Sequence, residues 1–319
     1  MLFLGILNYR CSLPTTCCQH TSYQGHILNL SALKDTPLRN VDDDYVSVII
    51  PAHNEELYIG ACLDALLAQD SKAGPVNIVV AANACQDGTV SKVESRVAHA
   101  RARGWNLTCL SIPEPGKLRA LNRAEAILAG EGVRVFLDAD VICEPALLGQ
   151  LRNALHNDRP LYATGTLSVA RPQTYATCAY ARVWTQLPFV NGGAVGAGLF
   201  AVNSAGRKRW GKFPNIISDD TYVRLHFAPD ERIEVPARYH WPMVEGINNL
   251  IRVRRRQDAG VREISRRWPD LMANEAKALL GPTLLTRIAV GDPVGLGIYL
   301  WVHGASRIRS SGREWTRGR

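Results

Sequence analysis

The chain of 319 residues has neither a CxxC cysteine pair nor an uninterrupted apolar run of about 20 residues, the length that a membrane-spanning helix needs. The nearest candidate, residues 284–305, is interrupted by Arg287, Asp292 and Pro293, so we expect no membrane span. The apolar residues 1–7 lack a basic segment and a small-residue cleavage site and do not predict a signal peptide. Most of the eight cysteines lie singly in apolar segments, which favours a reducing cytoplasm.

Acidic residues are fewer than basic ones, 29 against 37, which gives a formal net charge of +8. The basic excess is concentrated in residues 252–267 and 307–319. Such clusters suit phosphate groups, an anionic membrane surface or nucleic acid, and the last cluster can equally be a solvated basic surface. Because the sequence contains no recognisable DNA- or RNA-binding motif, we expect no nucleic-acid partner.

Apolar runs of strand length alternate with segments of helical spacing after residue 45. We expect strands at residues 46–50, 76–80, 107–112 and 133–137, and helices at residues 55–68 (with Asn54 as N-cap), from about residue 89, and at 118–129. Two further strand-like runs, 161–169 and 195–202, follow. This alternation predicts an α/β fold with a doubly wound, mostly parallel sheet.

The chain divides into three parts by sequence pattern. Residues 1–44 show no sustained period and predict an irregular N-terminal extension. Residues 45–230 carry the strand–helix alternation and predict the catalytic domain, and residues 231–319 predict a basic, amphipathic helical arm. Aromatic residues beside the arginines of this arm suit an interfacial helix on a membrane, which we favour over a helix packed on the domain.

Two aspartates, Asp138 and Asp140, directly follow the buried strand expected at 133–137. Ligands of doubly wound sheets bind outside the carboxyl ends of the strands. Two carboxylates one residue apart can hold Mg²⁺ or Mn²⁺ together with diphosphate oxygens, and the metal then neutralises charge on a leaving diphosphate. The alternative is an aspartate that caps the next helix.

Five ordered motifs of the chain resemble those of family 2 glycosyltransferases. They are VSVIIPAHNEE at 46–56, NACQDGT at 83–89, GKLRALN at 116–122, DAD at 138–140 and SDD at 218–220. The resemblance covers roughly residues 45–260, and the order and spacing of the motifs make it specific. It implies a GT-A fold, inverting transfer of a sugar from a nucleoside-diphosphate donor, and a divalent metal, Mn²⁺ or Mg²⁺.

The resemblance places Pro51, Ala52 and Glu55 at the nucleoside. Asn83 falls where many members hold an acidic residue against the base, and alanines at 81–82 replace the usual pair of aspartates. An asparagine amide can still pair with a base edge, because it offers both a donor and an acceptor. This departure leaves the identity of the nucleotide open.

The remaining catalytic roles follow from the same resemblance. It assigns Asp138 to the ribose and metal-bound water, and Asp140 to the metal and the diphosphate. Asp220 is the expected base that deprotonates the acceptor hydroxyl, with Asp219 as its neighbour. Lys117 is expected at the donor phosphates, the alternative being a solvated helix start.

Several further residues have weaker signals. Arg254 and Arg256 lie where related enzymes carry a basic segment over the diphosphate, and arginine suits bidentate phosphate contacts. The glycine-rich residues 191–198 are expected beside donor sugar and acceptor, because glycine permits close backbone approach. His240 can add a metal ligand and Trp184 can stack on a sugar ring, but we favour structural roles for both.

The resulting hypothesis is a glycosyltransferase of polysaccharide or glycolipid synthesis, with a saccharide or lipid-linked acceptor and an anionic membrane surface as a further partner. A catalytically inactive nucleotide-sugar binder or a nucleotidyltransferase on a similar sheet remains an alternative. The second acidic pair, Asp219 and Asp220, argues against an inactive binder, which would not need it. The hypothesis requires that Asp138, Asp140 and Asp220 share one cavity.

Overall fold

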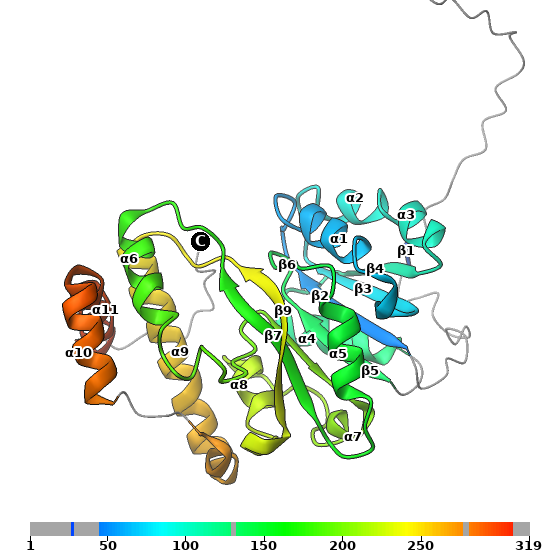
Figure 1. Ribbon diagram of the computed structural model, residues 1–319. Coiled ribbons are helices and arrows are strands. Elements are labelled where there is room, and N and C mark those ends of the chain that lie inside the picture. Colours follow the sequence, from blue (N-terminus) through cyan, green and yellow to red (C-terminus); the bar gives the residue numbers. More distant parts are fainter. Residues whose placement is uncertain (1–26, 29–44, 129–131, 277–280, 309–319) are drawn as a thin grey trace, which may run out of the picture.

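The computed structural model describes residues 27–28, 45–128, 132–276 and 281–308. Within these residues one nine-stranded sheet runs in the order β1-β4-β3-β2-β5-β8-β7-β9-β6 (Figure 1). The strands are β1 Ile27–Leu28, β2 Val46–Ala52, β3 Val76–Asn83, β4 Asn106–Ile112, β5 Val133–Leu137, β6 Ile142–Cys143, β7 Tyr162–Val169, β8 Leu199–Val202 and β9 Arg232–Trp241. 

The described helices cover the sheet and extend beyond it. The α-helices are α1 Ile59–Leu67, α2 Thr89–Glu94, α3 Val97–Ala102, α4 Lys117–Ala126, α5 Leu147–Leu155, α6 Tyr175–Trp184, α7 Ser204–Arg207, α8 Asp219–Arg224, α9 Ile247–Arg267, α10 Pro282–Gly291 and α11 Pro293–Ile308. Short 3₁₀ turns lie at Ser71–Ala73, Pro229–Glu231 and Pro269–Asn274.

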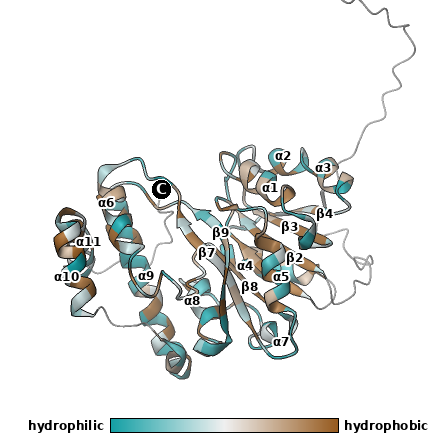
Figure 2. Ribbon diagram, in the orientation of Figure 1, coloured by the Kyte–Doolittle hydropathy of each residue, from teal (hydrophilic) through white to brown (hydrophobic). Residues whose placement is uncertain are grey.

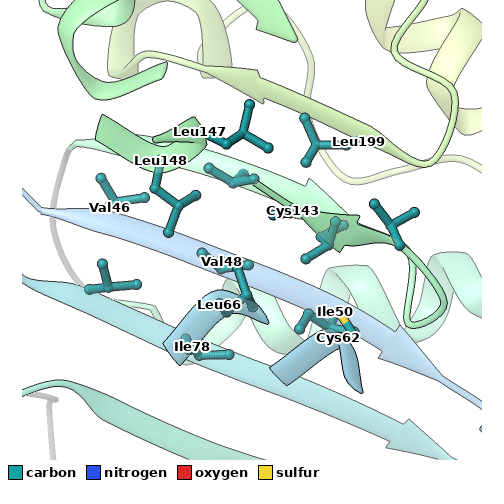
Figure 3. Close-up of a cluster of buried hydrophobic side chains, with 14 of the residues drawn as sticks. Val46, Val48, Ile50, Cys62, Leu66, Ile78, Cys143, Leu147, Leu148 and Leu199 are labelled. Atoms are coloured by element: carbon teal, nitrogen blue, oxygen red, sulfur yellow. The ribbon is translucent and has the colours of Figure 1, made fainter. Parts of the chain in front are cut away.

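Strands β2 to β5 are buried on both faces, which explains their continuous apolar sequences. Val48 and Ile50 of β2 point into the core that α1, α2, α3 and α5 cover, whereas Ile49 points into the core beneath α4 and α8. Figure 3 shows the first core, where Cys62 and Leu66 of α1 lie over the strands. The hydrophobic colouring of the central strands in Figure 2 reflects this two-sided burial.

The second half of the sheet is mixed. β8 pairs antiparallel with β5, with Leu199 opposite Leu137, and β7 pairs antiparallel with β8. β9 then returns parallel to β7, with a register shift between Gly165 and Thr166. This pairing brings the segment before β8 and the end of β9 to the edge of the sheet where β5 ends.

The C-terminal helices form a separate group at one side of the sheet (Figure 1). α11 packs against both α6 and α9, and α10 contacts α11. A third buried cluster holds this group together; we call it the C-terminal cluster, and it comprises Tyr180, Ala181, Trp184, Leu187, Val190, Met243, Leu250 and Val302. Within the described residues, no helix is long and apolar enough to cross a membrane.

The predicted fold class is confirmed, and the expected strands and helices before residue 140 are present with shifted ends. α1 begins at Ile59 instead of residue 55, because the chain first turns at Asn54, whose φ is +52°. Asn54 was expected to cap this helix, and this was wrong: its side chain accepts a hydrogen bond from Gln86 N at 2.7 Å. The strand expected at 195–202 begins only at Leu199.

The sequence reading missed β9, whose polar residues and Pro236 hide its strand character. β9 belongs to the sheet, so the boundary expected at residue 230 falls before the last long strand, and the helical part begins with α9. Within the N-terminal extension, residues 27–28 pair with β4 as β1. The rest of the expected irregular segment, residues 1–26 and 29–44, and the basic residues 309–319 lie outside the described residues.

Candidate active site

A cavity of about 710 Å³ lies at the carboxyl ends of β2, β3 and β5. The segment before β8, α8 and α9 also line it. Of the residues expected at the nucleotide sugar, the metal and the base, all except Ala52 line it, namely Pro51, Glu55, Asn83, Lys117, Asp138, Asp140, Asp219, Asp220, Arg254 and Arg256. The two acidic motifs therefore share one cavity, as the hypothesis requires.

Asp138 and Asp140 enter the cavity from the turn after β5. The backbone N–H of Asp138 donates to Gly198 O at 2.8 Å, and Val141 N closes the turn onto Asp138 O at 3.2 Å. The antiparallel pairing of β5 with β8 thus fixes the backbone that carries the two carboxylates.

Lys117 is the first residue of α4 and connects the two acidic motifs. Its Nζ lies 3.0 Å from Asp138 Oδ1 and 3.1 Å from Asp219 Oδ2. Burial lowers the pKa of this ammonium, but the carboxylates of Asp138 and Asp219 outweigh burial and raise the pKa above its ordinary value. Lys117 therefore stays charged and neutralises part of the acidic cavity.

Asp219 and Asp220 begin the short helix α8 after the N-cap residue Ser218. Asp220 Oδ1 accepts from the backbone N–H of Thr221 at 2.6 Å. Burial, and next the neighbouring Asp219 carboxylate, raise the pKa of Asp220, while Lys117 opposes this rise. A carboxylate with a raised pKa is a stronger base than an exposed aspartate, which suits proton abstraction from a hydroxyl.

The carboxylates of Asp138 and Asp140 offer oxygen donors for a hard divalent cation. Among the described residues, no group of three or more histidine, cysteine, aspartate or glutamate side chains is arranged to hold a metal ion. Mg²⁺, however, is commonly bound by one or two carboxylates together with substrate phosphates and water. The donor set therefore fits a cation that shares its coordination with a diphosphate, and does not fit a site made of protein ligands alone.

Asn83 lies at the end of β3 and is 3% exposed. Its Nδ2 donates to Ala52 O at 2.7 Å, and its Oδ1 accepts from Gly116 N at 3.0 Å. The Asn83 amide, which was expected to form hydrogen bonds with the nucleotide base, instead connects the end of β2 to the loop before α4. Ala52 is 1% exposed and contributes through its carbonyl. Asn83 therefore holds Gly116, the residue that precedes Lys117.

His53 is a cavity residue that the sequence reading missed. Its Nδ1 lies 2.6 Å from Asn83 O, which fixes the ring beside Pro51 and Glu55 in the cavity wall. Asp87, in the loop after β3, accepts from Thr89 N at 3.1 Å and holds the start of α2. The position of His53 in the loop directly after β2 was the feature of the sequence that could have predicted it as a cavity residue.

The two arginines of α9 lie at the far wall of the cavity. Arg254 forms an ion pair with Asp258 one helical turn later. This pairing holds its guanidinium on α9, whereas Arg256 lines the same wall without being a member of that pair. The expected contact of both arginines with a diphosphate stays a prediction.

The cavity ends in an apolar wall that the sequence reading did not anticipate. We define the apolar wall as Tyr180, Trp184, Trp241, Met243, Val244, Leu250 and Val253, which come from α6, the end of β9, the following loop and α9. The ring centroids of Trp184 and Trp241 lie 5.8 Å apart in a stacked pair. Trp184 thus belongs to the C-terminal cluster and also lines the cavity. A structural role and a contact with a sugar ring, the two alternatives considered for it, are therefore compatible.

His240 and the glycine-rich residues 191–198, which had weaker sequence signals, differ in their position relative to the cavity. His240 Nε2 lies 3.9 Å from Glu144 Oε1, beside the β6–β9 pair. Of the glycine-rich residues 191–198, Ala197 and Gly198 line the cavity. Gly198 has a φ of +74°, and a Cβ there would lie 2.6 Å from Trp241 Cδ1, so this position requires glycine.

Residues 47–190 match the family described as Glycosyl transferase family 2. A search of curated proteins returned no match. Among solved structures, the fold is similar to a mannosyltransferase of Pyrobaculum calidifontis in complex with GDP-Man and Mn²⁺, at 24% identity and a TM-score of 0.51, with 83% of this chain and 76% of that chain covered.

Two further solved structures have lower similarity. TarS (residues 1–349) of S. aureus in complex with UDP has 15% identity and a TM-score of 0.47, covering 77% of this chain and 72% of that chain. Glucosyl-3-phosphoglycerate synthase of Mycobacterium tuberculosis, in complex with Mn²⁺ and UDP-glucose, has 18% identity and a TM-score of 0.45, covering 70% and 78%.

Proposed function

The chain is a glycosyltransferase that uses a nucleotide sugar, with a family 2 domain over residues 47–190, and from that premise we propose that it inverts the anomeric centre of the transferred sugar. The acceptor oxygen attacks the anomeric carbon, the bond from that carbon to the diphosphate breaks, and the hydroxyl proton passes to the Asp220 carboxylate. The observation that carries this proposal is the common cavity of the two acidic motifs.

The donor half of the proposed site consists of the ends of β2, β3 and β5. We propose that Pro51, His53 and Glu55 contact the nucleoside and that Asn83 positions the loop of Lys117 through its bond to Gly116. The Lys117 ammonium then faces the donor diphosphate while it holds Asp138 in place. Arg256, which lines the cavity from α9, supplies a further positive charge for the same phosphates.

We propose that Asp138 and Asp140 hold Mn²⁺ or Mg²⁺ together with the donor diphosphate. Such a cation supplies charge neutralisation for the leaving nucleoside diphosphate. The support is the oxygen donor set on the turn after β5 and the room for a ligand in the cavity. Lys117 lies against one oxygen of Asp138, so it supplements this neutralisation from the α4 side.

The proposal is tested by separating donor binding from transfer. Thermal shifts with GDP- and UDP-sugars, with and without Mn²⁺, should identify the donor. A donor that binds the native state and not the unfolded chain raises the melting temperature. Asp140→Asn should abolish the Mn²⁺-dependent part of that shift. Asp220→Asn should keep the shift and lower the transfer rate by about 10²- to 10⁴-fold, the usual contribution of a general base.

Two controls make this experiment decisive. Asp270→Asn changes an aspartate outside the cavity lining and should leave both shift and rate unchanged. An Asp220→Asn protein with full transfer activity would remove Asp220 from the mechanism. Donor binding without transfer to any acceptor in the wild-type protein would instead support the inactive nucleotide-sugar binder.

We further propose that α10 and α11 bind an anionic membrane surface. Their outer face exposes Val290, Val294, Leu300, Trp301 and Ile308, which are between 51% and 81% exposed. The chain continues into the arginine-rich residues 307–319, whose charge complements anionic lipid. An apolar face next to arginines is the pattern of an interfacial helix.

Vesicle sedimentation tests this second proposal. The protein should bind vesicles of phosphatidylglycerol more strongly than vesicles of phosphatidylcholine, and salt should weaken the binding. Leu300→Ser with Trp301→Ser should reduce it, whereas Ser91→Ala on the exposed surface of α2 should not. Equal binding to both vesicle types, or a dimer in light scattering that the double variant dissociates, would contradict a membrane role for this face.

A further inference from the structure

The lining of the cavity has chemically different parts. Lys117, Asp138, Asp140 and Asp220, which come from the starts of α4 and α8 and the turn after β5, form a charged part of the lining. The apolar wall forms another part of the lining, and on α9 it is flanked by Arg254, Arg256 and Gln257. The proposed function assigns the donor diphosphate and its cation to the charged residues, so the apolar wall is available to another part of the reacting molecules.

The apolar wall is built on a packed support. Trp184 is 7% exposed, Met243 is 8% and Leu250 is 4% exposed, and all three belong to the C-terminal cluster. The stacked rings of Trp184 and Trp241 lie at an interplanar angle of 29°, and Phe189 packs edge-on against Trp184. The wall therefore exists before a ligand arrives.

The wall also adjoins the reacting groups. The Trp241 indole packs against Gly198, whose carbonyl accepts from the backbone N–H of Asp138. Ser218, the residue before the acidic pair of α8, lines the same cavity. A ligand on the wall thus lies beside the turn that carries Asp138 and shares its cavity with the start of α8.

We propose that the acceptor carries an alkyl or aryl group next to its reacting hydroxyl, and that this group binds against the apolar wall. This inference rests on the proposed glycosyl transfer. The side chains of Met243, Val244, Leu250 and Val253 offer no hydrogen-bond partner to the hydroxyls of a saccharide acceptor, and only the rings of the wall carry polar atoms. An apolar group instead gains free energy in proportion to the surface that it buries there.

An alcohol of this kind has two sources, a free hydrophobic alcohol or a lipid in a membrane. The helices α6 and α9, which carry much of the wall, pack against α11 on the opposite side. Tyr180 of the wall stacks on Tyr299 of α11, with ring centroids 5.4 Å apart. Helix α11, which carries exposed apolar residues, therefore packs on the helices that hold the apolar wall, and the experiment has one arm for each source.

The first arm measures transfer by the full chain to methyl, butyl, hexyl and octyl β-glucosides below their micelle concentrations. We expect kcat/KM to rise about fourfold per methylene while the chain still finds apolar surface. Met243→Gln with Val253→Thr, which keeps side-chain size and adds polar atoms, should flatten this rise. The same rate for methyl and octyl glucoside would overturn the inference.

Binding without turnover separates this inference from the proposed function. Quenching of tryptophan fluorescence by octyl glucoside should exceed that by methyl glucoside, and the double variant should lose the difference. If the protein neither binds nor hydrolyses any donor, the proposed glycosyl transfer is rejected. The quenching experiment still shows whether the apolar wall binds an alkyl group. Equal quenching by both glucosides, or quenching unchanged in the double variant, would overturn the inference.

The second arm offers a long-chain alcohol either in solution with albumin or within phosphatidylglycerol vesicles. Trp301→Ser on the exposed face of α11 is the control, because it leaves the wall intact. A loss of rate confined to the vesicle form supports a membrane source, and an unchanged rate in both forms supports a free alcohol. Transfer to neither form, with full transfer to a hydrophilic sugar, would contradict an apolar acceptor.

Discussion

The ammonium of Lys117 lies 3.1 Å from Asp219 Oδ2 and so joins the start of α4 to the start of α8. The same Nζ lies 3.0 Å from Asp138, so one side chain connects the motif expected to hold the metal with the motif expected to hold the base. The Asp219 side chain is 10% exposed and that of Lys117 is 31% exposed, so the pair is partly buried. Neither distance follows from the spacing of the motifs in the sequence.

Replacing Lys117 by methionine should lower kcat by about 100-fold, the scale at which the loss of one charge-stabilising group affects a transition state. Arginine at this position should not restore the rate, because its planar guanidinium cannot replace a compact ammonium between two carboxylates. Steady-state kinetics with the donor found by thermal shift measures the effect. Lys92→Met on the exposed surface of α2 is the matched control and should behave as wild type. Wild-type kcat in Lys117→Met would contradict this role.

Replacing Asp219 by asparagine should move the acid limb of the kcat–pH profile to lower pH. Burial and the Asp219 charge both raise the pKa of Asp220, because a nearby negative charge favours the protonated form. Removing that charge lowers the pKa, so Asp220 loses its proton, and can act as a base, at lower pH. A shift of the limb to higher pH, or none, would show that Asp219 does not set the pKa of the base.

Replacing Gly198 by alanine should destabilise the protein by about 1–3 kcal/mol and reduce transfer. The backbone there has a φ of +74°, and the added Cβ would lie 2.6 Å from Trp241 Cδ1. Because Gly198 O also accepts from Asp138 N, a backbone shift would displace the acidic turn. Chemical denaturation measures the free energy of unfolding. Gly211→Ala, where a Cβ meets nothing within 4 Å, should show neither effect.

The stability of the native state should fall as the pH is lowered from about 6.5, the unperturbed histidine pKa, toward 4. Burial, and next the charge of Arg254, lower the pKa of His303 to about 4 in the folded protein. In this interval the unfolded chain binds the proton and the native state does not, so acidification favours unfolding. Thermal melts at pH 7 and pH 5 measure the loss of Tm.

His303→Phe should make this pH dependence smaller, since phenylalanine keeps the ring packing with Tyr299 but cannot take a proton. The ring centroids of His303 and Tyr299 lie 4.2 Å apart, so the substituted ring finds the same neighbour. His156→Phe, in the loop after α5 and exposed, serves as the comparison. The same loss of Tm in His303→Phe as in the wild type would assign the acid sensitivity to other groups.

The sequence by itself determined the sheet before residue 140 and the cavity residues that follow its strands. β-branched runs such as residues 46–50 have no polar face to expose, so they form strands buried on both sides, and polar loops then meet at the carboxyl edge. Asp138, Asp140 and the pair at 219–220 could be found because their motifs have fixed residue types in a fixed order.

Only the tertiary structure decided how these residues are connected. β9 joins the sheet through parallel pairing with β7, a long-range contact that leaves no local period. The amide of Asn83 is used by Ala52 and Gly116, and Lys117 reaches two carboxylates, because chain segments far apart in sequence meet at one edge of the sheet. The apolar wall is likewise shared by α6, β9 and α9, and each contributes too few residues for a sequence signal.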